Sequence, residues 1–132
     1  ESLNDTVGAA LLEPHINYTN HVFKLLNEKI NINGIAHITG GGLTENIPRI
    51  LPNGCSVKIQ KGTWPSLPIF DTLKDLGNVE EEEMYQAFNM GIGMVFIVDS
   101  DMVDSVKNAL DNITNIYTIG EVIEGENIVH YN

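Results

Sequence analysis

The stretch from Ala36 to Pro52 reads AHITGGGLTENIPRILP, and the organisation of the chain can be worked out from it. Residues 35–39 are short, apolar and partly β-branched, which predicts a strand. Three glycines follow, and then a run that predicts a short helix limited by Pro48, which has no N–H to donate inside a helix. Because glycine is unfavourable inside either element, the triple glycine indicates a backbone that something approaches closely.

A strand that passes through glycines into the start of a helix is a recurring anion-binding arrangement. His37 and Thr39 face the same side of a strand, so both are expected to reach a ligand held by Gly40, Gly41 and Gly42. An imidazole at His37 can take or give a proton near neutral pH, which makes it a catalytic candidate. Two alternatives stay open, namely a tight turn packed against a neighbour and a half-buried histidine without a catalytic part.

The helix after the glycines adds three polar candidates. Glu45 suits the positive end of a helix, and Asn46 is placed either to cap the helix or to reach the ligand. Arg49, the only arginine, suits phosphate, and it is equally well explained as a surface residue or as the partner of a carboxylate. The loop is not a Walker loop, because no Gly-Lys-Ser/Thr follows, and GxGxxG does not fit it.

The rest of the chain alternates helical and strand patterns without the strict βαβ rhythm of a Rossmann fold. Helices are predicted over about residues 14–30, 67–77, 80–90 and 102–113, and strands over 55–60, 94–98, 116–123 and 128–131. Gly77 is expected at the C′ position of the second helix, and Asp99 and Asp101 are expected to cap the last one. The pattern predicts an α+β domain with a mixed, mostly antiparallel sheet covered by helices, preceded by a loose lead-in at 1–10.

Composition narrows the function classes. The chain has 132 residues and a formal net charge of -11, with seven scattered basic residues, so nucleic-acid binding is not expected. A phosphorylated ligand would need backbone N–H groups, a metal or a partner domain. No apolar run has the length of about 18 residues that a membrane span needs. The single Cys55 and the absence of a basic leader fit a cytoplasmic location.

Metal binding is not expected from the sequence. The run Glu80–Glu83 is better explained as acids gathered where a helix begins. His15, His21 and His130 have no partners at the spacing of metal ligands, and Cys55 on a strand is expected to be a core thiol.

Three blocks of sequence resemble the C-terminal domain of the aminoimidazole ribonucleotide synthetase family, the phosphoribosylformylglycinamidine cyclo-ligases. The first is HITGGG with ENIPR and a leucine–proline close, at 37–52. The second is GNV with EMY and FNMGIGM, at 77–94, and the third, weaker block is LLEP at 11–14 with Tyr18. They follow the family's order and cover about residues 11–120.

The resemblance implies an ATP-dependent enzyme of de novo purine biosynthesis. Such enzymes close formylglycinamidine ribonucleotide to aminoimidazole ribonucleotide and release ADP and phosphate, with Mg²⁺ accompanying the nucleotide. It further implies a layered α/β/α fold of ferredoxin-like character at 11–132 that forms one wall of the active-site cleft. The family's N-terminal domain, which binds most of the ATP and forms the homodimer, is absent from this sequence, so we expect the chain alone to be inactive.

The resemblance also implies which residues lie near the ligand. These are Thr39, Gly40, Gly41 and Gly42, with His37, Glu45, Asn46 and Asn89 as further candidates. Gly91 and Gly93 are interpreted as structural. The sequence leaves open which group acts as general base and whether the loop holds phosphate of the substrate or of ATP. His15 and Ile16 stand where the family has a threonine and a basic residue.

Two alternative interpretations remain. One is a related enzyme: formylglycinamide ribonucleotide amidotransferase, selenophosphate synthetase, thiamine-monophosphate kinase or the hydrogenase maturation factor share this domain. Their glycine loops differ from HITGGG, and they lack the EMY and FNMGIGM block. The other is a non-catalytic module that senses a nucleotide or a protein. An upstream coding region for an ATP-binding half favours the enzyme, whereas a start codon next to Glu1 favours the module.

Overall fold

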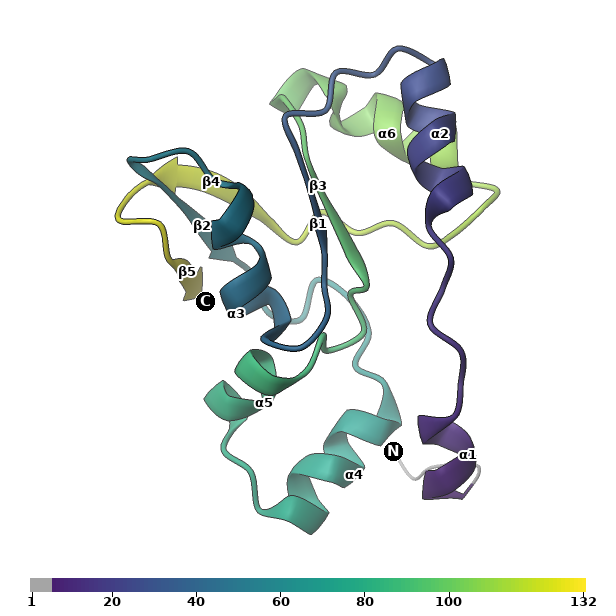
Figure 1. Cartoon of the computed structure of the whole chain (residues 1–132), viewed down its shortest axis with the longest axis vertical. Helices are drawn as coiled ribbons and strands as arrows, with labels where there is room; N and C mark the ends of the chain where they lie inside the picture. The colour runs from purple at the N-terminus through teal and green to yellow at the C-terminus, as the bar shows by residue number, and fades with distance from the viewer. Residues whose placement is uncertain (1–5) are drawn as a thin grey trace.

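The computed structural model describes residues 6–132 (Figure 1). The helices are α1 (Val7–Leu11), α2 (Thr19–Asn27), α3 (Gly42–Asn46), α4 (Pro68–Gly77), α5 (Glu81–Ala87) and α6 (Val103–Leu110), with single 3-10 turns η1 (Pro48–Ile50) and η2 (Ser100–Met102). The strands are β1 (Gly34–His37), β2 (Cys55–Ile59), β3 (Met94–Ile97), β4 (Gly120–Glu124) and β5 (Val129–Tyr131). No helix within 6–132 is long and apolar enough to cross a bilayer.

The strands form two small sheets. β1 pairs with β3 in antiparallel fashion, which places His37 opposite Met94. In the second sheet β2 lies between β4, its antiparallel neighbour, and β5, its parallel neighbour. The predicted α+β class and the mostly antiparallel pairing are confirmed. β4 and β5 are consecutive in the chain but do not pair, because β2 occupies the position between them.

Two apolar cores cover opposite faces of the β1–β3 sheet. Phe96 of β3 packs against a small core between α2 and α6, which contains Leu25, Ile30, Val106 and Leu110. Its neighbours Val95 and Ile97 point the other way, into a larger core. The buried members of that core are Ala36, Ile38, Leu43, Ile47, Leu51, Val57, Ile59, Trp64, Tyr85 and Ile92. Because side chains alternate along a strand, one short strand serves both cores, and helices lie on both sides of it.

Several predicted element ends are wrong by a few residues. The first predicted helix does not begin near Pro14. It begins at Thr19, where the side chain of Asn17 accepts a hydrogen bond from the Thr19 N–H at 3.0 Å. Helix α1 forms inside the predicted lead-in, whose residues 1–5 lie outside the described residues. The strand predicted from residue 116 begins only at Gly120.

Two predicted caps also differ. Gly77 is the last residue of α4, and Asn78 takes the left-handed conformation beyond it with φ 48°. Asparagine tolerates this region better than most residues, so it replaces glycine as the terminator. Asp99 makes no capping hydrogen bond, and its Oδ1 accepts from Asn33 Nδ2 at 2.8 Å. That bond joins the start of the last helical segment to the residue before β1.

Candidate functional site

The three segments that carry the resemblance converge in space. The N–H of Ile38, which follows β1, donates to the carbonyl of Gly93 at 2.9 Å. Gly93 is buried, and a Cβ at this position would run into the hydroxyl of Tyr18 and lie 3.0 Å from Cε1 of His15. The segments around residues 15–18, 37–42 and 88–93 therefore meet at one place, which is the candidate functional site.

Two of the three glycines are required by the fold. Gly42 has φ 56°, and a Cβ there would collide with the carbonyl oxygen of Tyr85 and lie 2.5 Å from that of Phe88. Gly41 precedes α3 with φ 93°, a conformation that disfavours a side chain. At Gly42 the close approach inferred from the sequence is therefore the backbone of α5, as the tight-turn alternative expects.

Gly40 is different. No atom lies within 4 Å of the position a Cβ would take, and its φ is outside the positive range. The residue is exposed, and the N–H groups of Gly40 and Gly41 make no hydrogen bond within residues 6–132. Neither packing nor backbone conformation explains a glycine here, so Gly40 leaves open space in front of free backbone donors.

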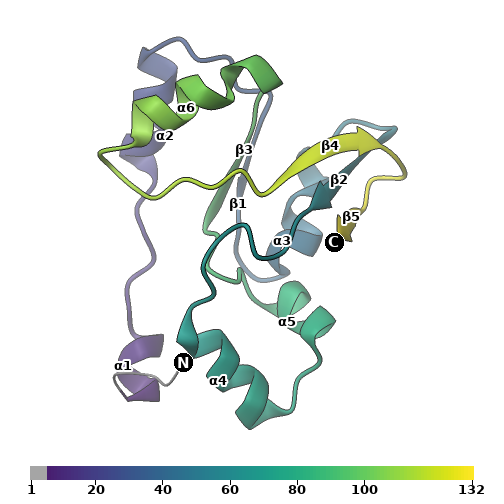
Figure 2. The same ribbon diagram turned by 180° about the vertical axis from the view of Figure 1, so that it is seen from behind.

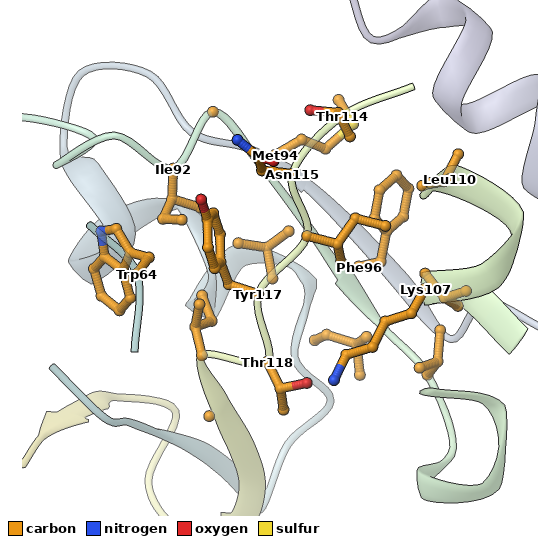
Figure 3. A pocket seen from close by; sticks show the side chains of 18 of the residues that line it. Trp64, Ile92, Met94, Phe96, Lys107, Leu110, Thr114, Asn115, Tyr117 and Thr118 are labelled. Carbon is orange, nitrogen blue, oxygen red and sulfur yellow. The ribbon is translucent and has the colours of Figure 1, made fainter. Parts of the chain in front are cut away.

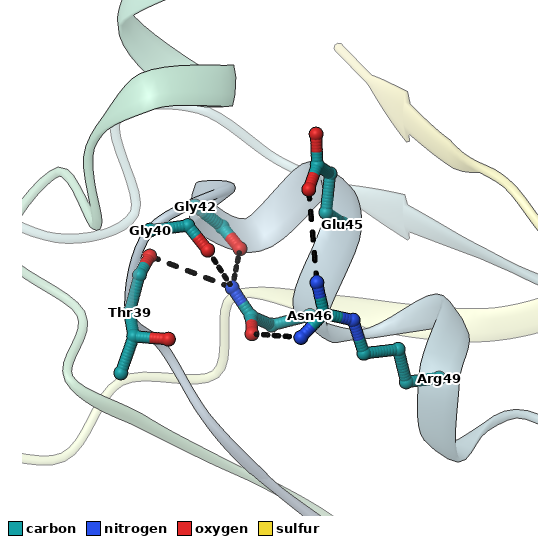
Figure 4. A network of polar contacts seen from close by, with 6 residues as sticks. All are labelled: Thr39, Gly40, Gly42, Glu45, Asn46 and Arg49. Carbon is teal, nitrogen blue, oxygen red and sulfur yellow. Dashed lines mark hydrogen bonds and ion pairs between the residues drawn. The ribbon is translucent and has the colours of Figure 1, made fainter.

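Asn46 holds the shape of the loop. Its side chain is buried, and Nδ2 donates to the carbonyl oxygens of Gly42 at 2.8 Å, Gly40 at 3.2 Å and Thr39 at 3.5 Å (Figure 4). The amide nitrogen is therefore fully used inside the protein. These bonds turn the carbonyl groups of the loop toward Asn46. The backbone N–H groups of the loop are then on its opposite side.

Glu45 and Arg49 form a pair on the exposed side of α3. Arg49 NH2 lies 3.7 Å from Glu45 Oε2, and its NH1 donates to Asn46 Oδ1 at 3.3 Å (Figure 4). Of the interpretations of Arg49 that the sequence allows, the structure favours those of an exposed side chain that pairs with a carboxylate. Glu45 Oε2 also lies 2.6 Å from where a Cβ on Gly41 would stand, so a carboxylate borders the loop.

His37 is the last residue of β1, and Thr39 lies two residues beyond the end of the strand. Both are exposed, whereas Ile38 between them is fully buried. In the part of the chain that the structure describes, the His37 ring and the Thr39 hydroxyl make no hydrogen bond, so both are available to a ligand beside Gly40.

Asn89 has a structural part in the neighbouring loop. Its Oδ1 accepts from the Gly91 N–H at 3.0 Å, and its carbonyl accepts from Ile92 N–H at 3.0 Å. These bonds shape a turn in which Met90 and Gly91 have φ 50° and 90°. The turn follows α5 directly, so Asn89 shapes the chain after this helix, while its contact with a ligand stays a prediction.

A cluster of rings was missed by the sequence reasoning. The ring of His15 lies 5.0 Å from that of His37, and the ring of Tyr18 lies 5.7 Å from His15 and 5.3 Å from that of His21. Burial raises the pKa of the Tyr18 hydroxyl, so Tyr18 stays neutral. The signal available beforehand was the weak block containing residues 11–14 and Tyr18, because spacing alone does not bring His15 and His37 together.

The cluster does not form a metal centre. Within residues 6–132 no group of three or more histidine, cysteine, aspartate or glutamate side chains is placed to hold a metal ion. His21 is buried, and neither of its ring nitrogens has a hydrogen-bond partner among the described residues. Glu45 is the carboxylate beside the loop and is paired with Arg49. These residues do not fit a Mg²⁺ site.

An apolar pocket next to the site belongs to the core, and Tyr18, His21 and Gly93 contribute to its wall. This pocket of about 490 Å³ is bounded by β3, α6 and the connection from α6 to β4, which crosses the β1–β3 sheet in Figure 2. Its walls are mostly apolar and include Met94, Phe96, Leu110 and Tyr117 (Figure 3). None of the predicted site residues lines it. We place the candidate site at the glycine loop, where exposed polar groups converge.

The comparisons with known proteins identify the family. Residues 1–131 match the family model described as AIR synthase related protein, C-terminal domain. The chain therefore belongs to this family. The computed structure also resembles Escherichia coli HypE, a hydrogenase maturation protein, with a TM-score of 0.65 and 20% identity over 86% of this chain and 36% of that one, which shows a shared fold.

The sequence relatives are more specific. The chain is 51% identical over 122 residues to the phosphoribosylformylglycinamidine cyclo-ligase of Acetivibrio thermocellus, covering 92% of this chain and 36% of that protein. It is 47% identical over 129 residues to the cyclo-ligase of Geobacillus thermodenitrificans, covering 97% and 37%. A bifunctional purine biosynthetic protein, purD of Dictyostelium discoideum, is 43% identical over 122 residues, covering 92% and 15%. The chain thus spans little more than a third of the length of the cyclo-ligases it matches.

Proposed function

We propose that this chain forms one wall of the active site of an ATP-dependent phosphoribosylformylglycinamidine cyclo-ligase. In the proposed reaction, ATP phosphorylates the formyl amide oxygen of formylglycinamidine ribonucleotide. The amidine nitrogen then attacks the activated carbon, the imidazole ring of aminoimidazole ribonucleotide closes, and ADP and phosphate leave. The identity to enzymes named for this activity, at 51% over 92% of the chain, supports the proposal.

The open space at Gly40 is the structural observation that supports the proposal most directly. Gly40 is the loop glycine that neither packing nor a positive φ requires, and it stands beside the free side chains of His37 and Thr39. The N–H groups of Gly40 and Gly41 and the Thr39 hydroxyl are donors suited to phosphoryl oxygens. His37 is the group in reach that can accept a proton from a reacting nitrogen.

The remaining predicted residues have supporting parts. Asn46 and Asn89 fix the two loops, and Glu45 with Arg49 borders the site. The binding of ATP and Mg²⁺ is assigned mainly to an N-terminal domain outside these 132 residues. The proposal includes a homodimeric, cytoplasmic full-length enzyme in which residues 11–132 form the C-terminal domain and residues 1–10 a lead-in.

The test is reconstitution. The 132-residue chain is mixed with the remaining part of a related cyclo-ligase, and ring closure is followed as ADP release that depends on formylglycinamidine ribonucleotide. We expect turnover from the mixture and none from the chain alone. Turnover by the chain alone would refute the requirement for a second part, whereas ADP release that does not depend on this substrate would refute the substrate assignment.

A matched pair of variants then tests the glycine loop. Gly40→Ala is expected to lower kcat/KM at least about tenfold, because the new methyl group enters the space in front of the free N–H groups. Gly8→Ala is the control, since Gly8 also has no atom within 4 Å of a Cβ position and lies in α1. Equal activity of the two variants would remove Gly40 from the site.

A further inference from the structure

Three of the four histidines gather at the candidate site. The rings of His15 and His37 meet edge to face, with centroids 5.0 Å apart and planes at 85°. Tyr18 lies within 6.3 Å of His37 and 5.7 Å of His15. His15 and His37 are both exposed, and His37 lies three residues before Gly40 in the chain.

The surroundings of this pair leave it without a fixed counter-charge. Neither imidazole forms an ion pair with a carboxylate in the described chain. The ring of Tyr18, which burial keeps neutral, lies next to both imidazoles, and His21 lies 5.3 Å from Tyr18. Arg49, the only arginine, is engaged with Glu45 and Asn46. Among the described residues, the imidazoles of His15 and His37 are therefore the side chains of the cluster that can carry a positive charge at this site.

The hydrogen bond of His15 determines which nitrogen is free. Nδ1 of His15 lies 3.1 Å from the carbonyl oxygen of Ile16. A carbonyl oxygen only accepts, so Nδ1 carries the hydrogen and Nε2 is bare in the neutral ring. Nε2 becomes a donor only when His15 takes up a proton. His37, whose ring has no hydrogen bond among residues 6–132, can present an N–H in either tautomer.

We propose that His15 and His37 together bind the dianionic phosphate group of a phosphomonoester next to Gly40, with proton uptake at His15. This rests on the proposed function, in which the ligand is a ribonucleotide, and it gives His37 a part in binding phosphate in place of the proton transfer considered above. Charge-assisted N–H···O bonds from two imidazoles satisfy the geometry of a phosphate with several acceptor oxygens. They also supply local positive charge in a chain whose net charge of -11 repels anions.

The test uses the full 132-residue chain and ring-carbon NMR of its four histidines. Ribose 5-phosphate is added at constant ionic strength and at a pH just below the usual histidine pKa of about 6.5. We expect the Cε1–H signals of His15 and His37 to move together with one dissociation constant, and the His15 signal to move toward that of a protonated imidazole when the sugar phosphate is bound. His130, which is exposed on β5, should not respond.

Variants separate this site from general ionic effects. His15→Asn keeps a side-chain N–H donor but cannot take up a proton, and it should weaken binding at least tenfold. His130→Ala is the matched control and should bind like the parent chain. Equal shifts of all four histidines, no shift at all, or undiminished binding by His15→Asn with unchanged backbone amide signals would each overturn the proposal.

The outcome is distinguishable from failure of the proposed function. If the histidine pair binds ribose 5-phosphate but the reconstituted protein does not close the ring, the binding site stands and the enzymatic assignment falls. If the reconstituted enzyme is active and His15→Asn leaves its KM unchanged, the assignment stands and the histidine site falls. Ribose, which lacks the phosphate, should give no shift, and a shift with ribose would assign the contact to the sugar and overturn the phosphate site.

Discussion

At the scale of single residues, the three consecutive glycines have three different reasons to be glycine. Gly42 admits the carbonyl groups of α5, Gly41 provides a left-handed turn before α3, and Gly40 leaves open space. The sequence predicted a close approach to this backbone, and it left packing and ligand binding as alternatives. The choice between them depends on the positions of Tyr85 and Phe88, which lie more than 40 residues further along the chain. The sequence around the glycines does not predict that the carbonyl groups of these two residues lie beside Gly42.

The first prediction concerns Gly42. Gly42→Ala should lower the free energy of unfolding by about 3 kcal/mol, because the methyl group meets two backbone oxygens and the residue has a positive φ. Gly40→Ala should change it by less than about 0.5 kcal/mol, since the site is open and exposed. Urea denaturation of both variants measures the difference. Similar losses for the two would mean that α5 does not press on Gly42.

A second prediction concerns the amide of Asn46. In the parent chain the buried Asn46 Nδ2 donates to three carbonyl oxygens of the loop. Asn46→Asp puts a carboxylate there, whose oxygens can only accept hydrogen bonds. We expect a loss of about 3 kcal/mol near neutral pH.

Part of that loss should return on acidification. Burial raises the pKa of the introduced carboxyl in the folded state, so protonation favours the folded form, and the protonated group can donate one hydrogen bond. Unfolding curves across pH compare the variant with the parent. If the loss in free energy of unfolding of the variant became larger as the pH falls, the amide nitrogen of Asn46 would not be the group that faces the carbonyls.

At the scale of elements, the existence of helices and strands followed from periodicity, while their ends depended on single side chains. The strand before the glycines and the helix after Asp99 lie where the pattern predicts them. The predicted start of α2 was wrong because the Asn17 side chain accepts a hydrogen bond at the first turn, so the helix does not begin at Pro14. The predicted end of α4 was wrong because Asn78, and not Gly77, takes the left-handed conformation that ends the helix.

Helix α5 is tied to the end of β2 by one cation. Lys61 Nζ lies 2.6 Å from Glu81 Oε1 and 4.9 Å from the centre of the Tyr85 ring. The hydrogen bond to Glu81 raises the pKa of Lys61, and the same bond lowers the pKa of Glu81. Because the pKa of Glu81 is lowered in the folded state, its contribution to stability is present above the usual value of 4.5 and is lost as pH falls through the lowered pKa.

The third prediction follows from this contact. Glu81→Gln should cost less than about 1 kcal/mol near neutral pH, since half of the Glu81 side chain is exposed. The difference should vanish once the pH lies well below the lowered pKa of Glu81. Lys61→Met should keep a deficit there, because the contact of the ammonium with Tyr85 and Tyr131 does not titrate. Thermal unfolding of both variants at the two pH values distinguishes the ion pair from the ring contacts, and equal acid behaviour would contradict this division.

At the scale of the whole molecule, the class of fold and the family could be inferred from the sequence, but the meeting of the three segments could not. The cluster of His15, Tyr18 and His37 depends on Gly93, which belongs to a third segment and makes room for the Tyr18 hydroxyl. The strands form two sheets where one was predicted, and β2 lies between β4 and β5. Both features depend on tertiary packing and cannot be predicted from local hydrophobic periodicity.

The fourth prediction tests how the N-terminal segment is held. Gly93→Ala should displace Tyr18 and His15 and loosen the extended stretch between α1 and α2. We expect faster proteolytic cleavage within residues 12–18 and loss of mutual shifts between His15 and His37, with a smaller effect at the glycine loop. Limited proteolysis followed by mass spectrometry locates the cleavage. Gly40→Ala provides the control, because it adds the same methyl group in open space and at a residue without a positive φ. Equal cleavage in both variants would show that Gly93 does not anchor the segment.

The hydroxyl of Tyr131 on β5 is 2.8 Å from Thr44 Oγ1, a residue of the helix that follows the glycines. These two residues are 87 positions apart. A ribosome adding about 5 to 20 residues per second needs roughly 4 to 17 s to travel that distance. During synthesis, α3 therefore lacks its hydrogen bond to β5 until this strand, one of the last to be made, leaves the ribosome. In that interval we expect the glycine loop to be accessible to chaperones and proteases.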